Sequence, residues 1–142
     1  MKNKMLTIML IILVTILLVG VIALVVIFKL DDKDAEAKEP SIEEVIEASV
    51  DIPEITTNLS GNDYIRISFK VQTDSKEAKE ELEKRVFQVN NVIIEELSEM
   101  KSSELEGKKG KQTIENTVKE KVNALMQEGK VEKVYITSMM IQ

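Results

Sequence analysis

Within residues 64–100 (YIRISFKVQTDSKEAKEELEKRVFQVNNVIIEELSEM) the spacing of apolar residues changes from every second residue to every third or fourth. Apolar and polar residues alternate over residues 64–73, which is typical of a strand with one buried face. After Asp74, the expected cap, one stripe predicts a single amphipathic helix that ends near Met100. The stripe consists of Ala78, Leu82, Val86, Val89, Ile93 and Leu97, widened by Val92 and Ile94. The stretch therefore predicts a mixed α and β domain.

Two more strands and one more long helix are expected around this stretch. Residues 50–59 are strand-like, with Pro53 indicating a sheet edge, and the turn-forming residues 60–63 (SGND) join them to residues 64–73 as a hairpin. Residues 131–141 predict a final strand that holds Tyr135. The second helix is preceded by Ser103 and Glu106, which have capping-box spacing, and by an interruption at Gly107 and Gly110. Gly129 is expected to end it. Its apolar stripe consists of Ile114, Val118, Val122, Leu125 and Met126.

The N-terminal segment is apolar. Residues 5–28 carry no charged side chain and lie between Lys4 and Lys29, and at about 1.5 Å per residue they can cross a ~30 Å hydrocarbon core. A cleaved signal peptide has a shorter apolar core followed by small residues at a cleavage site, and that pattern is missing here. We therefore expect an uncleaved transmembrane helix at 5–28 after a short cytoplasmic tail at 1–4. Basic residues are nearly equal in number before and after the apolar segment, so the positive-inside rule alone does not decide the orientation. We expect the N-terminus inside because long domains are exported largely regardless of their charge.

Residues 29–49 are predicted to be a juxtamembrane linker, with a short helix at 42–48 indicated by the capping box of Ser41 and Glu44. Residues 50–142 are then one domain. Residues 31–100 hold 19 acidic and 8 basic residues, whereas residues 101–142 hold 6 acidic and 8 basic ones. This acidity argues against nucleic-acid binding. Two explanations of the asymmetry stay open: solvated surfaces, or a head-to-tail contact between acidic and basic ends that builds a ring or filament.

The residue inventory argues against an enzyme. The chain has no cysteine and no histidine, which excludes disulfides, thiolate nucleophiles, Cys/His zinc sites and a histidine base. Glu95, Glu96 and Glu99 have the spacing of a solvated helix face rather than of a calcium loop. Residues 107–111 (GKKGK) lack the spacing of a phosphate-binding loop. We expect no catalytic residues, no metal and no cofactor.

Several short segments resemble the flagellar basal-body-associated protein FliL family. They are residues 57–59 (TNL), 64–67 (YIRI), 105–108 (LEGK), 122–125 (VNAL), 129–131 (GKV), 134–137 (VYIT) and 141–142 (IQ). The sequence departs from the family pattern at 138–140 (SMM), where an aromatic residue is usual, and at 52–53 (IP). The positions matched as structural ones are Asn58, Leu59, Gly107, Asn123, Tyr135 and Gln142.

The resemblance implies an α+β domain similar to stomatin/prohibitin (SPFH) domains, held outside the cytoplasm by an inner-membrane anchor. It also implies that the partners are the lipid bilayer around residues 5–28, the flagellar stator units and further copies of the chain in a ring. The alternative is a single-span sensor or modulator whose outer domain binds a small ligand or peptide. The few aromatic residues, and apolar positions that the core stripes account for, favour the scaffold over a ligand pocket.

Overall fold

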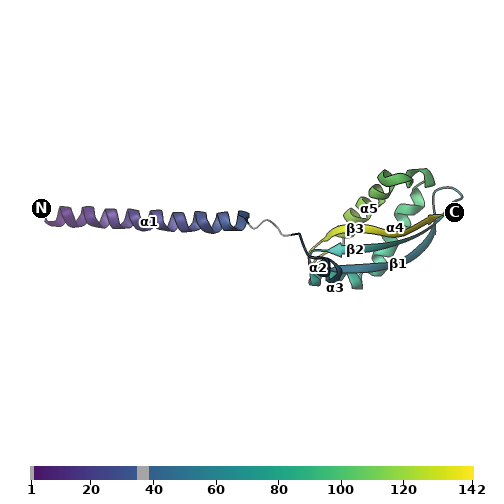
Figure 1. Ribbon diagram of the computed structural model, residues 1–142, viewed down its shortest axis with the longest axis horizontal. Coiled ribbons are helices and arrows are strands. Elements are labelled where there is room, and N and C mark those ends of the chain that lie inside the picture. The colour runs from purple at the N-terminus through teal and green to yellow at the C-terminus, as the bar shows by residue number, and fades with distance from the viewer. Residues whose placement is uncertain (1, 35–38) are drawn as a thin grey trace. The chain divides into compact units, whose positions relative to one another are not determined.

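The computed structural model describes residues 2–34 and 39–142, with side chains described for 2–27 and 39–142. It divides into two compact units, Met1–Glu39 and Pro40–Gln142. The first unit holds the helix α1 (Lys2–Asp34) (Figure 1). This helix runs six residues past the predicted end of the span at 28, because no glycine or proline interrupts it there. Part of the predicted linker, residues 35–38, lies outside the described residues.

The second unit is built on an antiparallel sheet of β1 (Ser49–Asn58), β2 (Tyr64–Thr73) and β3 (Val131–Ile141), in that order. The predicted hairpin is confirmed, since β1 pairs with β2 along nearly its whole length. Pro53 lies in an edge strand where the register shifts between Ile52 and Ile55, so its missing N–H interrupts no regular ladder. The apolar alternation of β2 is buried as expected: Ile65, Ile67, Phe69 and Val71 are all at most 1% exposed.

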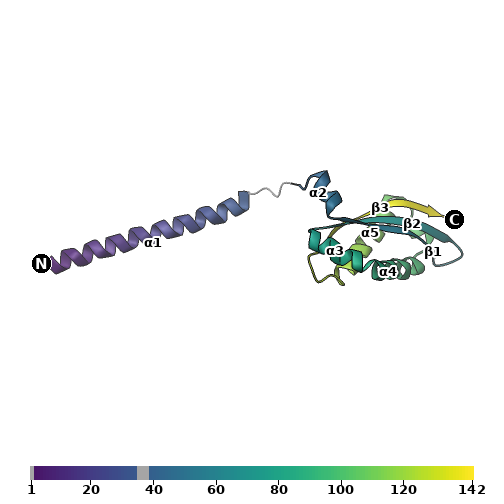
Figure 2. The same cartoon turned by 90° about the horizontal axis from the view of Figure 1, so that it is seen from below.

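Three helices supply the other half of the core. They are α3 (Lys76–Lys84), α4 (Val86–Glu99) and α5 (Gly107–Asn123). Helices α3 and α4 pack on β1, and α5 packs on β3 and α4. Figure 2 shows α3 and α4 on one side of the sheet and the short helix α2 (Ile42–Glu47) on the other. The helical residues of the core are Leu82, Val89, Ile93, Leu97, Ile114, Val118 and Val122.

The prediction of one unbroken helix from residue 75 to Met100 is wrong. Arg85 separates α3 from α4, with φ −98° and ψ 6°, and its N–H contacts both the Glu81 and Leu82 carbonyls. No glycine or proline causes this break. On a straight helix of 3.6 residues per turn the six stripe residues lie within about 100° of one another, because the three-residue step from Val86 to Val89 offsets the drift of the four-residue steps. The stripe therefore does not explain the break. The packing changes there, since α3 packs on β1 and β2 whereas α4 packs on β1 and α5.

The predicted helix ends also need correction. Ser75, not Asp74, caps α3 by accepting from the Ala78 N–H at 3.1 Å. The Asp74 carboxylate is used elsewhere, because it accepts the Lys130 N–H at the start of β3. Ser103 lies in the 3-10 turn η1 (Ser102–Glu104), which precedes α5, and Glu106 caps α5 with no side-chain bond. Gly107 and Gly110 lie inside α5, whose last residue is Asn123 rather than a residue next to Gly129.

Helix α2 is attached to the sheet. Its predicted capping box is confirmed, with the Ser41 N–H donating to Glu44 Oε2 at 2.7 Å and the Glu44 N–H donating to Ser41 Oγ at 3.3 Å. The Ala48 carbonyl, which follows α2, accepts both the N–H and the Oγ1 hydroxyl of Thr73 at the end of β2. The compact unit accordingly begins at Pro40, ahead of the first strand.

Candidate interaction surfaces

The six positions matched from the sequence do not converge on one site. Three of them lie around one end of the sheet, where Asn58 pairs with Tyr64 and the backbones of Tyr64 and Gln142 exchange two hydrogen bonds of 2.8 and 2.9 Å. Leu59 follows Asn58 and is buried at 3% exposure. These residues have a structural role at this end of the sheet. None of them lines the groove described below.

The other three positions also have structural roles. Gly107 begins α5 with a φ of +71°, a conformation that favours glycine. Asn123 ends the same helix and bonds to β3. Tyr135 is half-buried on the sheet face that α3 and α4 leave open; its hydroxyl donates to Gln72 Oε1 at 3.0 Å and its ring lies 4.9 Å from Lys133 Nζ. Tyr64 on the same face is exposed, and neither tyrosine belongs to the core.

The core does not account for every apolar residue, contrary to the expectation from the sequence. Phe87 is 71% exposed and Ile94 is 41% exposed, both on α4. Met140 on β3 and Ile42 and Ile46 on α2 are also largely exposed. Isolated exposed apolar residues are common, but an exposed phenylalanine beside a groove is typical of contact surfaces. Phe87 therefore marks the strongest candidate for a contact surface.

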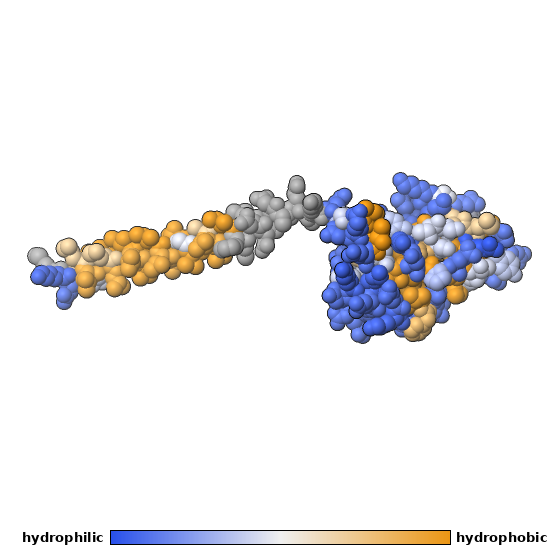
Figure 3. Space-filling view, turned by 60° about the horizontal axis from the view of Figure 1, so that its bottom comes forward, coloured by the Kyte–Doolittle hydropathy of each residue, from blue (hydrophilic) through white to orange (hydrophobic). Residues whose placement is uncertain are grey.

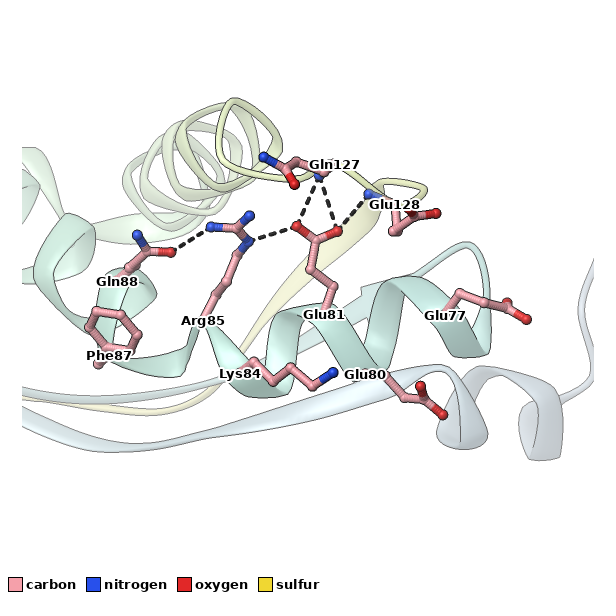
Figure 4. A pocket seen from close by; sticks show the side chains of 9 residues that line it. All are labelled: Glu77, Glu80, Glu81, Lys84, Arg85, Phe87, Gln88, Gln127 and Glu128. Carbon is pink, nitrogen blue, oxygen red and sulfur yellow. Dashed lines mark hydrogen bonds and ion pairs between the residues drawn. The ribbon is translucent and has the colours of Figure 1, made fainter.

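Phe87 lies at a groove of about 580 Å³ between α3, the start of α4 and the turn after α5 (Figure 4). Most of its side chains are charged, four of them glutamates. The lining residues are Glu77, Glu80, Glu81, Lys84, Arg85, Phe87, Gln88, Gln127 and Glu128. The sequence gives little indication of this groove, because Gln127 and Glu128 are more than forty residues from Glu81. The one indication is Phe87 itself, which falls outside the apolar stripe of its helix.

Glu81 holds the groove together. Its carboxylate accepts the Gln127 N–H at 3.0 and 3.1 Å, the Glu128 N–H at 2.6 Å and Arg85 Nε at 2.7 Å. The Glu128 N–H has the largest effect on the pKa of Glu81; burial opposes it, Arg85 and the Gln127 N–H act with it, and the pKa stays below its ordinary value of 4.5. Arg85 is oriented in turn by Gln88 at 2.8 Å. Glu81 and Arg85 are therefore structural members of the groove wall.

The remaining acids of the groove face solvent. Among the residues that the structure describes, Glu77, Glu80 and Glu128 make no ion pair, and all three are exposed. Lys84 is the only other cation in the lining. The groove thus combines a fixed wall, an exposed aromatic ring and three free carboxylates, an arrangement suited to a cationic, partly apolar partner.

The predicted solvated face of Glu95, Glu96 and Glu99 is only partly free. Lys121 on α5 lies 3.0 Å from Glu96, and that carboxylate raises the pKa of Lys121. The Glu95 side chain accepts from Asn91. Within the described ranges, no group of three carboxylates is arranged to hold a metal ion. Glu96 thus ties α4 to α5.

The comparison with known families accounts for the domain as a whole. The family model for "Flagellar basal body-associated protein FliL" matches residues 49–142, which contain the whole sheet and α3 to α5. The chain belongs to the FliL family. "Flagellar protein FliL" of Bacillus subtilis (strain 168) is 51% identical over 108 residues, 76% of each chain. "Flagellar protein FliL" of Aquifex aeolicus (strain VF5) is 29% identical over 79 residues, 56% of this chain and 49% of that protein.

FliL membership confirms the resemblance drawn from the short segments and makes the chain a flagellar basal-body-associated protein. FliL is a family of structural and accessory proteins rather than a known enzyme family. The N-terminal helix is consistent with that assignment, because one helix in the described chain, Lys2–Ile27 of α1, is long and apolar enough to cross a membrane. Figure 3 shows hydrophobic side chains around most of this helix and a largely hydrophilic surface on the domain.

Proposed function

We propose that this FliL-family chain is a membrane-anchored scaffold that supports the stator units of the flagellar motor by contact and self-association. Its tail at 1–4 lies in the cytoplasm, and residues 5–28 span the bilayer. Residues 29–49 connect the span to the sheet, with residues 40–49 already part of the compact unit, and the domain at 50–142 works outside the cytoplasm with an SPFH-like fold. The observation that carries the proposal is the joining of an apolar N-terminal helix to a domain matched as FliL over residues 49–142.

The surface of the domain supports action through contact. Its most distinctive feature is the charged groove beside Phe87. Ligand pockets enclose most of a small molecule's surface, whereas this groove is open to solvent, and eight of the nine residues that line it are charged or amide-bearing. A surface of this kind is suited to the charged side chains of another protein. The groove thus favours the scaffold over the small-ligand sensor.

Deleting the gene should test the function. We expect flagella to assemble normally but to turn weakly, most visibly under high load, and the labelled stator units to leave the motor sooner. The control is an exported form of residues 40–142 without the anchor, which should fail to restore motility because tethering supplies the effective concentration near the partner. Full rescue by the untethered domain would favour a diffusible ligand-binding role. Normal motility and stator retention at every load would refute the scaffold.

Topology can be measured separately. The chain has no cysteine, so a cysteine introduced at the exposed Ser103 is the only thiol. An impermeant maleimide should label it in intact cells with the outer layers permeabilised. A cysteine at Asn3 is the matched control and should react only after lysis. Labelling in the reverse order would refute the orientation.

A further inference from the structure

The two ends of α5 carry opposite charge. The groove lies at its C-terminal end, because Gln127 and Glu128, in the turn after the helix, both donate N–H bonds to Glu81. Lys108, Lys109 and Lys111 lie at the N-terminal end; all three are exposed, and in the described part of the chain none makes an ion pair. With 17 residues, α5 separates the two ends by about 25 Å.

These three lysines destabilise the helix that carries them. Cations near a helix N-terminus face the positive end of the macrodipole and cost roughly 0.3–1 kcal/mol each at the surface. No acidic residue lies in the first turn of α5 to offset them, and Glu106 just before it makes no side-chain cap. Fold stability therefore does not explain this cluster, whereas a partner that carries negative charge does.

The groove has the chemistry that such lysines require. A lysine places its ammonium group beside carboxylates and lays its methylene stem on an apolar surface. Glu77, Glu80 and Glu128 supply free carboxylates, and the exposed ring of Phe87 supplies a surface for the stem and for a cation–π contact. Glu81 and Arg85, bonded to each other, keep the wall in place without using these groups.

We propose that the groove receives the lysine-bearing start of α5, residues 108–111, from a second copy of this chain. The interface is head-to-tail: the groove of one copy engages the next copy, and its own lysines engage the copy before it. Repetition of a contact between two different surfaces builds a ring if it closes and a filament if it does not. This inference rests on the proposed self-association and identifies the surfaces that make it.

Cysteine cross-linking in native membranes tests the interface. Lys84→Cys lines the groove and Gln112→Cys lies one turn beyond Lys108, so a short bis-maleimide should join copies of the double variant into dimers, trimers and larger species. A bond within one copy leaves a monomer, so only bonds between copies can produce the dimers, trimers and larger species. The matched control, Ser138→Cys with Gln112→Cys, places one thiol on the open sheet face and should give no ladder. Products that stop at dimers would overturn the head-to-tail contact.

Charge reversal adds a second readout on the cysteine double variant. Glu80→Lys and Lys109→Glu should each lower the yield of trimers and larger species by roughly fivefold, and the combination should restore it. The same change outside the interface, Glu83→Lys on α3 or Lys119→Glu on α5, should leave the yield unchanged. Phe87→Ala should lower the yield and Phe87→Leu should largely keep it. Reversals that act equally at all four charged positions, with no restoration, would overturn the proposal.

The interface and the scaffold can fail separately. A general amine-reactive reagent applied to the wild-type membranes reports whether copies associate at all. A ladder with this reagent but none from the cysteine pair would refute the groove interface and leave self-association standing. No ladder with either reagent, in cells with working motors, would refute both. Melting curves of every variant should match the wild type, so a loss of cross-linking cannot be assigned to unfolding.

Discussion

The side chain of Asn123 binds both backbone polar groups of Val131. Its Nδ2 donates to the Val131 carbonyl at 3.1 Å, and its Oδ1 accepts the Val131 N–H at 2.6 Å. One side chain at the end of α5 thus satisfies both backbone polar groups of the first residue of β3, which is an edge strand. The turn between them includes Gln127 and Glu128, so the same clamp fixes the donors that bind Glu81.

Replacing Asn123 with alanine should destabilise the domain by about 1–3 kcal/mol, because the Val131 N–H and carbonyl lose their partner near a buried side chain. Asn123→Asp keeps an acceptor for the N–H but places a carboxylate oxygen against the Val131 carbonyl, so it should destabilise the domain as well. Urea denaturation of residues 40–142 measures both free energies of unfolding. An Asn123→Ala domain as stable as the wild type would contradict the clamp.

Gly110 should not tolerate a side chain. It is buried in α5, and a Cβ there would lie 2.5 Å from the Glu104 carbonyl oxygen and 2.6 Å from the Leu105 carbonyl carbon. Gly110→Ala should cost about 1–3 kcal/mol through overpacking, despite the better helix propensity of alanine. Gly107→Asn is the control, since its site is open and asparagine tolerates the φ of +71°. A stabilised Gly110→Ala protein in thermal melts would contradict the packing.

The start of the domain can be tested by truncation. A fragment that begins at residue 51 lacks the Ala48 carbonyl, which accepts two bonds from Thr73, and the buried side chain of Val50. We expect it to be less stable than the fragment 40–142 by about 2–5 kcal/mol, from two hydrogen bonds and one buried valine. Paired denaturation curves measure the difference. Fragments of equal stability would place α2 outside the cooperative unit.

Acid should act on the groove through Glu81. Its pKa is lower in the folded state than the unfolded value near 4.5, so its contribution to stability is present above pH 4.5 and is lost as the pH falls through the folded pKa. Glu81→Gln removes that contribution. The gap in unfolding free energy between wild type and variant should therefore be constant near neutrality and narrow below pH 4.5. A gap that keeps its size in strong acid would show that ionisation of Glu81 is irrelevant.

The sequence by itself determined the elements whose cause is local. Alternation in residues 64–73 produced β2, the capping box of Ser41 and Glu44 produced α2, and the stripe through Ile114, Val118 and Val122 produced α5. Each of these patterns acts through neighbours within a few residues, where strand and helix periods are readable. The short segments at the turns and the final strand likewise identified the family.

Tertiary structure alone decided the break at Arg85 and the groove beside it. Nothing in the sequence near Arg85 interrupts a helix, and the break falls where the packing changes from β1 and β2, which contact α3, to β1 and α5, which contact α4. Asp74 has the right position in the sequence to cap α3, but its carboxylate accepts the N–H of Lys130, far along the chain. Glu81 meets Gln127 and Glu128 in the same way. Contacts between residues so far apart in the chain produce no periodic pattern in the sequence, because they depend on how whole helices and strands pack together.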